Sequence, residues 1–429
     1  MAVLSTSTVA GALAHTYNYE NYLAPHERMM TKFWDTVQDF EDGGEPVGAD
    51  RSWEIVTSDS HAATTGAEGA DLPAFAAPSS IQATISAIQH MSSVAWSELL
   101  LAVGKSPGTV TKVNIIDRYV EMTTRNFYQM LNRMTLGHST GRLAVVETTT
   151  SSSTSFVCRN PEGVLQLRVG LPVGFYDTDT GGTLQGSANT ITAINFETRT
   201  CTITSASLTA GWGVYRTGTY GLGMVGLRGV ADNTALVTTI YGKSRATYPS
   251  LNATVLTAGG GTQAYSEKLV RKGLNRIFFK VGVEADEIWC NQGIIGEHLN
   301  HLTGNRVFQV TGDGVPSYQI GHKDESIAFV HNGKKIPFKI ESDLPARELI
   351  AIYKPWFRRH ILRKPSWIGD DVGPEGSSTP VLLQVPGTTN TYATSKIAGL
   401  LAFMALGHLQ PAGTCSVREI ADEELAGDA

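Results

Sequence analysis

Two short motifs combine residue types that could carry out chemistry. EHLNH at 297–301 places His298 and His301 one helical turn apart, as two zinc ligands would be. It lacks the HExxH order, and no third ligand lies near it in the sequence. GHSTG at 137–141 has the spacing of a nucleophilic serine, but it follows a helix, whereas a nucleophile elbow leads from a strand into a helix. We therefore expect a polar helix face and a helix-ending turn.

Two GKS tripeptides, at 104–106 and 242–244, match the end of a phosphate-binding loop. Leu99 and Val237 stand where the first glycine of such a loop belongs, so turns are the better interpretation. The carboxylates form no pair suited to acid–base work. We expect no catalytic, cofactor or metal site, and a protein that is not an enzyme.

The one strongly basic run is KPWFRRHILRKP at 354–365, which includes Arg358 and Arg359. Its tryptophan and phenylalanine favour one interpretation, a phosphate contact with aromatic stacking. The other is an ion-pair patch between subunits that faces acidic segments. Residues 35–50 and 419–429 carry acids and no base. These acids are expected either to be solvated or to keep a polyanion off their surface.

Composition indicates an ordinary globular chain of 429 residues, with 41% hydrophobic and 17% charged residues. A net charge of −6 argues against tight nonspecific binding of nucleic acid, which requires an excess of Lys and Arg. The four cysteines are dispersed without a CxxC pair, which favours a reducing compartment. The most apolar stretch, Ile397–Leu406, is too short to cross a bilayer, and the sequence predicts a cytosolic protein.

The elements that must position these residues begin with an extended arm. Residues 52–97 contain no Lys or Arg. Two β-competent runs, Trp53–Ser58 and Ile81–Val94, flank a middle whose only bulky apolar residues are Leu72 and Phe75. A two-stranded ribbon is marginal alone in water. The arm must therefore lie on the rest of its chain or on another copy.

A long amphipathic helix is predicted over Thr109–Leu136, after a helix over Ala24–Phe40 and a short one over Glu98–Val103. Its apolar positions recur at helical spacing: Val113, Ile116, Val120, Phe127, Met130 or Leu131, and Met134. At 1.5 Å per residue this helix is roughly 40 Å long. It is long enough to act as a spine.

The rest of the chain changes character twice. Short strands with Gly and Asp turns across 143–230, among them LQLRVGLPVGFYDT, predict a small all-β insertion that could form a barrel. A mixed α/β region follows. The patterns there predict helices over Ser266–Val281, Ile294–Leu302 and Ser395–Gly407, strands over Glu287–Cys290, Leu349–Tyr353 and Thr414–Ile420, and a hairpin with a type I′ turn at Asn332-Gly333.

This order of elements resembles the major capsid protein of tailed bacteriophages, which has the Hong Kong 97-type fold. The resemblance covers roughly residues 20–420. The local matches are TLGHSTGRLAVV (135–146), RVGLPVGFYDTDTGG to CTIT (168–204), GLRGVADN (226–233), YGKSRATYPSLNATV (241–255), LNRIFFKVGVEADEIWCN (274–291), DLPARELIAIY (343–353) and GHLQPAGTCSVREI (407–420).

The resemblance implies an α+β fold with an N-terminal arm, an extended loop, a spine helix, a mixed α/β axial domain and a β-rich insertion domain. The implied divisions are 1–50 for the arm, 51–97 for the loop, 98–142 for the peripheral domain with the spine helix, 143–162 for the start of the axial domain, 163–225 for the insertion, and 226–429 for the axial domain and returning peripheral strands.

The function implied is that of a shell subunit, which assembles as hexamers and pentamers into an icosahedral capsid around packaged double-stranded DNA. Implied partners are further copies of the chain, a portal, a separate scaffolding protein, a possible decoration protein and weakly held DNA, with no membrane. The implied location is the virion, after assembly in the host cytoplasm. An encapsulin-like shell around cargo enzymes is the alternative, and a β-rich adhesin or tail component is a more distant one.

One departure from the family matters for assembly. In its best-known member a lysine on the extended loop bonds covalently to an asparagine of a neighbour. Residues 52–97 contain no lysine, so we expect a noncovalent shell. The acidic arm is expected to lie over a neighbour's basic helix. The expected inter-subunit contacts are Trp53, Glu54, Asp59, Glu68, Asp71, Leu72, Phe75, Lys112, Arg118, Arg125, Arg358 and Arg359.

Overall fold

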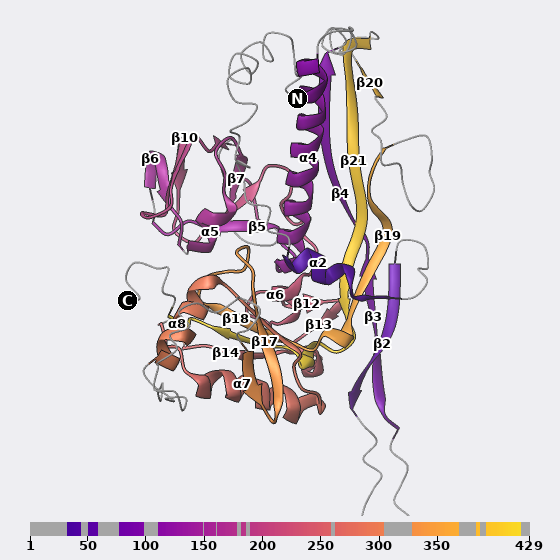
Figure 1. Cartoon of the computed structure of the whole chain (residues 1–429), viewed down its shortest axis with the longest axis vertical. Helices are drawn as coiled ribbons and strands as arrows, with labels where there is room; N and C mark the ends of the chain where they lie inside the picture. The colour runs from indigo at the N-terminus through magenta and orange to yellow at the C-terminus, as the bar shows by residue number, and fades with distance from the viewer. Residues whose placement is uncertain are drawn as a thin grey trace, which may run out of the picture. The chain divides into compact units, whose positions relative to one another are not determined.

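The computed structural model describes residues 32–43, 50–58, 77–97, 110–148, 150–159, 161–177, 182–185, 189–258, 262–303, 328–368, 383–386 and 392–421. The chain divides into two compact units (Figure 1). The first unit comprises Met1–Trp34, Ala87–Asn132 and His360–Ala405. The second comprises Asp35–Ser86, Arg133–Arg359 and Leu406–Ala429.

The predicted spine helix is confirmed as α4 (Val110–Leu136). In the first unit it meets the preceding helix α2 (Lys32–Gln38), the described part of the helix expected over 24–40. The Trp34 ring lies 6.3 Å from that of Tyr128, and the Trp34 backbone N–H donates to Asn132 Oδ1 at 2.9 Å. The short helix expected over 98–103 lies outside the described residues.

The helix predicted over Ser395–Gly407 is wrong, because this segment belongs to the strand β21 (Tyr392–His408). It pairs antiparallel with β4 (Ile88–Ser97) in a continuous register from Ser395↔Ser97 to Met404↔Ile88. Burial alternates from Ile397 to Met404, where the buried positions are Ala398, Leu400, Ala402 and Met404, and the strand is buried continuously from there to His408. The intervening residues are also apolar, so the two-residue period is invisible in the sequence.

These two strands belong to a five-stranded sheet. Its order is β1-β19-β21-β20, with β4 paired to β21. The remaining members are β1 (Glu41–Asp42), β19 (Phe357–Trp367) and β20 (Leu383–Pro386). The basic run 354–365 therefore forms a one-turn 3-10 helix, Lys354–Trp356, and then most of β19. Its two prolines are compatible with this arrangement.

A six-stranded mixed sheet forms the main core of the second unit, in the order β14-β22-β18-β15-β17-β16. Its strands are β14 (Thr254–Leu256), β15 (Glu287–Cys290), β16 (Ala328–His331), β17 (Lys334–Ile340), β18 (Glu348–Ile352) and β22 (Cys415–Arg418). The helices are α7 (Glu267–Val281) and α8 (Gln292–Thr303). These confirm the predicted elements to within two residues.

The hairpin between β16 and β17 turns as predicted. Asn332 and Gly333 have φ angles of 48° and 84°, the two positive values that a type I′ turn requires. α7 covers one face of the sheet, and its buried residues Val270, Leu274 and Ile277 share a core with strand residues such as Ile288 and Val417. α7 ends at Gly282, whose φ of 71° suits a residue without a side chain.

The predicted β-rich region consists of two small sheets around one core. One sheet has the order β6-β10-β9 and the other β5-β11-β7-β8. The strands are β5 (Arg142–Val145), β6 (Thr150–Val157), β7 (Pro172–Tyr176), β8 (Asn189–Thr190), β9 (Ala193–Asn195), β10 (Thr200–Leu208) and β11 (Gly213–Arg216).

Phe156 from one sheet and Phe175 from the other meet edge to face, 5.4 Å apart. The described strands thus form two sheets around a shared core, and an isolated antiparallel bridge between Val146 and Cys158 links the end of β5 to the end of β6. A closed barrel stays a prediction. The stretch LQLRVGLPVGFYDT, expected to be a strand, is strand only in its second part. Its start belongs to the short helix α5 (Pro161–Gln166).

Candidate functional site

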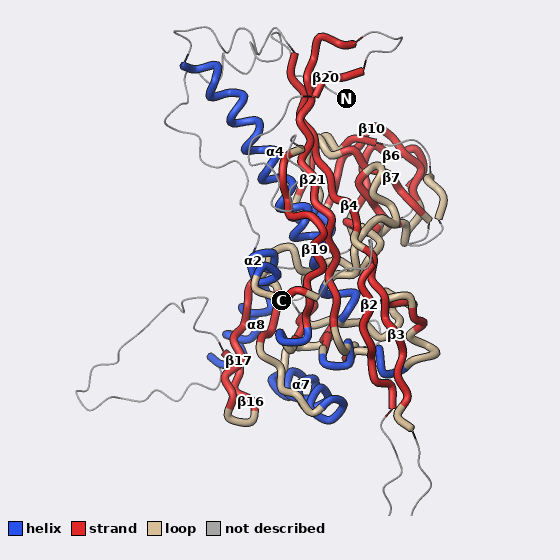
Figure 2. Tube along the Cα trace, turned by 90° about the vertical axis from the view of Figure 1, so that its right-hand side faces the viewer, coloured by secondary structure: helices blue, strands red, loops and turns tan. Residues whose placement is uncertain are grey.

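The extended arm is a two-stranded ribbon in its described part. β2 (Asp50–Ser58) pairs antiparallel with β3 (Ser79–Ser86), from Asp50↔Ser86 to Ser58↔Ser79 (Figures 1 and 2). The second β-competent run is split at Ala87, because its later half leaves the ribbon as β4. The ribbon is therefore built from segments that also enter other parts of the fold.

One face of the ribbon packs on the rest of the second unit, to which both of its strands belong. The Trp53 ring packs edge to face on Tyr241, with centroids 4.9 Å apart. Thr84 donates its backbone N–H to the Tyr241 carbonyl at 3.1 Å. Ile55 and Ala83 on the same face are fully buried. The ribbon root thus has the support from its own chain that a lone ribbon needs.

The other face of the ribbon is polar and exposed. It presents Glu54 and the half-exposed Val56, while hydroxyl pairs such as Ser52 Oγ and Thr84 Oγ1, 3.1 Å apart, link the strands. This is the face that is free to meet another molecule.

The residues predicted to make inter-subunit contacts are distributed as follows. Trp53 is used within the chain, and Glu54 is exposed. Arg125 forms an exposed pair with Glu121 at 2.7 Å, one turn earlier in α4. The structure thus brings none of these three together. Asp59, Glu68, Asp71, Leu72 and Phe75 lie outside the described residues, as do the side chains of Lys112 and Arg118.

Arg358 and Arg359 find their partners in the same chain. β1 runs parallel to the start of β19, with Glu41 opposite Arg358 and Asp42 opposite Arg359. The ion pairs measure 2.8 Å and 2.6 Å respectively. Three acids of 35–50, a stretch that the sequence left as solvated or polyanion-repelling, thus pair with the start of the basic run: Asp39 with Lys354, Glu41 with Arg358 and Asp42 with Arg359.

This acid–base seam adds little stability by charge alone. The two carboxylates are 72% and 63% exposed, so water screens the attraction and each pair contributes at most about 1 kcal/mol. The apolar contact beneath them matters more, because Phe40 stacks on the fully buried Phe357 at 5.1 Å. The charges mainly fix the register of β1.

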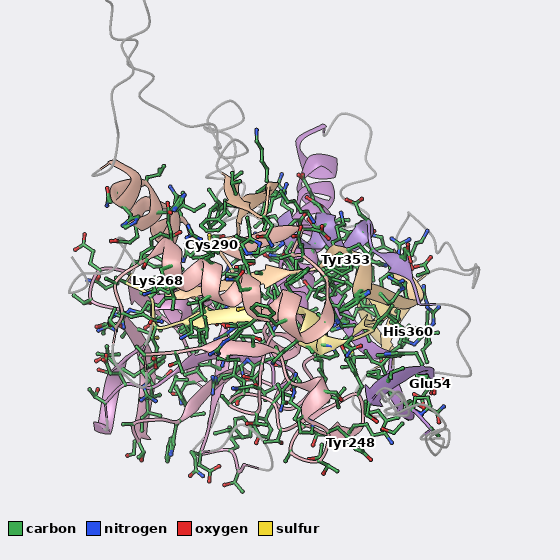
Figure 3. All side chains as sticks on the ribbon, turned by 90° about the horizontal axis from the view of Figure 1, so that it is seen from below. Glu54, Tyr248, Lys268, Cys290, Tyr353 and His360 are labelled. Carbon is green, nitrogen blue, oxygen red and sulfur yellow. The ribbon has the colours of Figure 1, made fainter. Side chains whose placement is uncertain are left out.

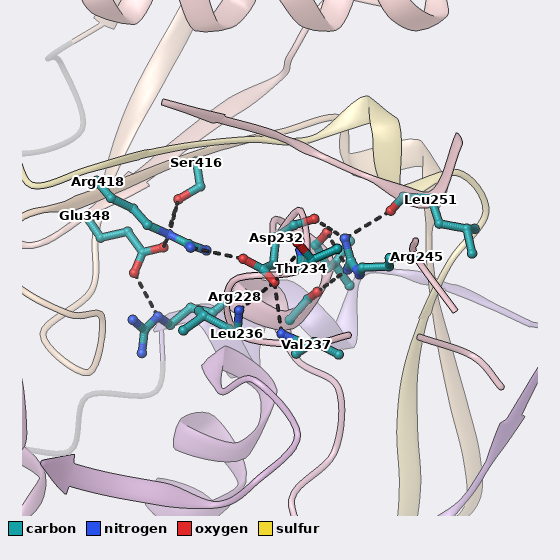
Figure 4. A network of polar contacts seen from close by, with 12 residues as sticks. Arg228, Asp232, Thr234, Leu236, Val237, Arg245, Leu251, Glu348, Ser416 and Arg418 are labelled. Atoms are coloured by element: carbon teal, nitrogen blue, oxygen red, sulfur yellow. Dashed lines mark hydrogen bonds and ion pairs between the residues drawn. The ribbon is translucent and has the colours of Figure 1, made fainter. Parts of the chain in front are cut away.

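A buried polar network lies under the six-stranded sheet (Figure 4). Glu348 on β18 accepts hydrogen bonds from Arg228 Nε at 2.8 Å, Arg418 Nε at 3.0 Å and Ser416 Oγ at 2.8 Å. Arg418 also donates to Asp232 Oδ1 at 3.0 Å. Two strands and the short helix α6 (Leu227–Val230) are thereby joined by charge-assisted bonds.

The network continues into the loop after α6. The second oxygen of Asp232 accepts the backbone N–H groups of Thr234, Leu236 and Val237 at 2.9–3.1 Å. The fully buried Arg245 donates to backbone carbonyls, including those of Asp232, Leu251 at 3.0 Å and Gly229 at 2.5 Å. These polar side chains hold an irregular segment in one conformation, as donors and acceptors buried without partners would be costly.

Electrostatics agree with this geometry. Burial alone would raise the pKa of Glu348, but Arg228 and Arg418 outweigh burial and lower it to about 2. Burial likewise opposes ionisation of Asp232, yet the backbone N–H groups and Arg418 lower its pKa. Both carboxylates are therefore charged at neutral pH and serve as fixed structural ions.

The stretches that hinted at chemistry are structural. Ser139 has a φ of 81° and its N–H donates to the Met224 carbonyl at 3.1 Å, so GHSTG is a turn. The Gly-rich segment GTYGLGMVGLRG at 218–229 packs closely against this turn and the end of α4. A Cβ on Gly226 would lie 2.2 Å from Thr135 O, and one on Gly223 would lie 2.8 Å from Ser139 O. Both motifs thus serve one tight backbone contact.

The EHLNH histidines do not form a metal site in the structure. His298 Nδ1 lies 2.8 Å from Tyr265 Oη, and its ring packs on Phe338. Across the described ranges, no cluster of three or more His, Cys, Asp or Glu could hold a metal ion. GKS at 242–244 does not lead into a helix, as the end of a phosphate-binding loop does, because Lys243–Ser244 is the short strand β13. No helix among the described residues is long and apolar enough to cross a membrane.

The sequence did not single out the Glu348 network. Its members stand in segments that carried the family resemblance, namely GLRGVADN, YGKSRATYPSLNATV, DLPARELIAIY and the final GTCSVREI. Opposite charges that lie up to almost two hundred residues apart in the sequence form no motif with a recognisable spacing. A charged residue inside an apolar strand, as in RELIAI, is the one local hint.

Comparison with known proteins identifies the fold. No family model and no curated protein sequence matches the chain. A chain of the cyanophage A-1(L) capsid asymmetric unit matches with a TM-score of 0.55 and 13% identity, over 94% of this chain and 96% of that one. A Mycobacterium phage Bobi structure matches at 0.45 with 10% identity, over 97% and 99%.

The holo-SrpI encapsulin complex from Synechococcus elongatus matches at 0.41 with 8% identity, over 98% of this chain and 96% of that one. Of these three structures, the cyanophage capsid chain is the one whose TM-score exceeds 0.5. The α+β Hong Kong 97-type fold expected from the sequence is confirmed.

Proposed function

From this fold we propose that the chain is the major structural subunit of a phage capsid. The observation that supports the proposal is the cyanophage capsid match, which spans nearly the whole of both chains. The molecule also has the parts a shell subunit uses: a ribbon rooted on its own body with one free face, and a rigid buried network. The proposal implies a structural and not an enzymatic role, since the matching structure is a capsid chain.

The finer proposal concerns assembly. Copies of the chain form hexamers and pentamers of an icosahedral shell around double-stranded DNA, with a separate scaffolding protein, a portal and possibly a decoration protein as partners. The shell forms in the host cytoplasm and persists in the virion. The free face of the ribbon makes contacts between copies, and these contacts are noncovalent because residues 52–97 contain no lysine.

Negative-stain microscopy of the purified protein tests the proposal. Closed shells tens of nanometres wide are expected. Discrete small oligomers under every assembly condition would overturn the function. Shells recovered from the natural source should protect DNA from nuclease, whereas shells filled with a cargo enzyme would identify an encapsulin-like compartment.

A further inference from the structure

The outer face of α7 is strongly basic in a chain whose net charge is −6. Four of its bases recur every fourth residue, which places them along one side of the helix. The five basic residues of the helix are Lys268, Arg271, Lys272, Arg276 and Lys280. All five are exposed, and Figure 3 shows Lys268 on the surface near one end of the helix.

Two phenylalanines stand on the same outer side. Phe279 is 81% exposed and Phe278 is 43% exposed, with their ring centroids 6.3 Å apart. At 100° per residue, Phe279 falls between Lys268 and Lys272 in the angular order around the helix, in the middle of the basic face. Along the axis Phe279 stands near the C-terminal end of α7, beside Arg276 and Lys280 and roughly 16 Å from Lys268. The two exposed rings beside these cations form an apolar patch that a partner molecule can cover.

The charges of this face are largely uncommitted. Arg271 approaches Glu267 only to 3.9 Å, and Lys280 Nζ reaches two backbone carbonyls at 3.2 and 3.4 Å. Lys268, Lys272 and Arg276 have no ion-pair partner among the described residues. The opposite side of α7 is buried on the sheet, so the helix is already held and loses no further order on binding.

We propose that this face binds an acidic amphipathic segment of a partner protein. Exposed aromatic side chains beside a row of cations are typical of an interface, where Phe and Arg are enriched. The partner would place apolar side chains on Phe279 and carboxylates on the surrounding bases. Duplex DNA would use the charges alone and leave both phenylalanine rings exposed, so it fits the face less well. This inference does not require that the chain form a shell.

A fluorescence anisotropy titration tests it on full-length, unassembled subunits. The probe is a labelled synthetic helix of about 20 residues, which spans about 30 Å, with Glu on one face and Leu on the other. We expect saturable, salt-sensitive binding. Lys272→Glu with Arg276→Glu, and separately Phe279→Ala, should each weaken it about tenfold or more. These side chains are exposed, so thermal melting should stay unchanged.

The matched controls reverse a charge and remove a ring elsewhere. Lys335→Glu on β17 and Phe196→Ala, where Phe196 is 60% exposed, should leave the affinity as it is. The same peptide with its leucines scattered around the helix should bind about tenfold more weakly. Equal affinity for a DNA duplex of similar length, or no effect of Phe279→Ala, would overturn the proposal. Binding of the peptide only by a variant that ends at Ala421 would also overturn the proposal, because it would assign the face to the chain's own acidic residues 422–429.

Discussion

At Glu348 a single buried carboxylate holds α6, β18 and β22 together through two arginines and a serine. Both oxygens of Glu348 have partners, while Arg418 Nη2 is buried without one among the described residues. The net contribution of the arrangement is smaller than its hydrogen bonds suggest, because its charges were taken out of water. Removing one partner is a different matter. The charges that faced the removed group then stay buried with less compensation, and their desolvation is the source of the cost.

The substitution Glu348→Gln should therefore be strongly destabilising. It keeps the volume but removes the carboxylate that pairs with Arg228 and Arg418, of which Arg418 retains Asp232, at a cost of about 3–5 kcal/mol in the free energy of unfolding. Urea denaturation of the unassembled subunit measures this cost. The matched control is Glu121→Gln in the exposed pair with Arg125, which should cost less than about 1 kcal/mol. Equal effects of the two substitutions would contradict the role given to the network.

Two buried histidines predict how stability depends on pH. Burial penalises the imidazolium, lowering the pKa of His90 to about 4, and burial together with Arg358 lowers that of His408 to about 3. Both titrate near 6.5 when unfolded. Below pH 6.5 the unfolded chain therefore binds protons that the native chain does not. The free energy of unfolding should fall by up to about 1.4 kcal/mol per pH unit per histidine, down to the native pKa.

Urea midpoints measured between pH 7 and pH 4 check this dependence. His408→Gln removes one of four histidines whose pKa burial lowers, the others being His90, His138 and His298. It should make the slope shallower, even though it lowers stability at every pH. Glu348 does not affect this slope above pH 4.5. Its contribution to the free energy of unfolding is complete above its unfolded pKa near 4.5 and is lost only as the pH falls from there towards 2. An unchanged slope in His408→Gln would contradict the assignment.

At the scale of elements, the ribbon of β2 and β3 depends on where its root is anchored. Trp53 sits between Tyr241 and the backbone of Gly407, where a Cβ would lie 3.3 Å from the indole. Trp53→Ala should cost about 3 kcal/mol at this root. Amide hydrogen exchange should speed up across β2 and β3 while α7 is unaffected. Val56→Ala, on the exposed face of the same strand, is the control, and comparable exchange in both variants would contradict the anchor.

Local patterns predicted the spine helix and most elements of the second unit, and they failed where the environment decides the structure. The spine helix has an apolar stripe, and the β16–β17 hairpin has an Asn-Gly turn, so each has its cause within a few residues. β21 does not. Its Ala-, Leu- and Met-rich sequence suits a helix, and only pairing with β4 makes it a strand. Sheet contacts between segments 300 residues apart override local propensity.

The candidate site was less predictable than the fold, for a related reason. The basic run at 354–365 was evident, but its acidic partners became clear only through the parallel pairing of β1 with β19. The bases of α7 were hidden among apolar residues, and only the helix gathers them on one side. Which charged side chains act together thus depends on which residues the folded backbone brings close to one another.

At the scale of the whole molecule, the lysine-free stretch 52–97 predicts how copies are joined. Boiled denaturing gels of assembled shells should show one band at the 46.1 kDa subunit mass, since the loop has no amine to form an isopeptide bond. A ladder of covalent multimers would contradict this. Shells of a cross-linking phage, run on the same gel, provide the control for detecting a ladder.

All four cysteines are buried and free, and burial raises the pKa of Cys415 to about 12. A maleimide must reach the sulfur, so all four buried side chains are poor targets while the protein is folded, including Cys201, whose pKa is lowered by its hydrogen bond with Cys158. The native chain is therefore a silent background for thiol labelling. One cysteine introduced at an exposed position, such as Phe196, would carry a dye or a displayed molecule at a single known place on every copy.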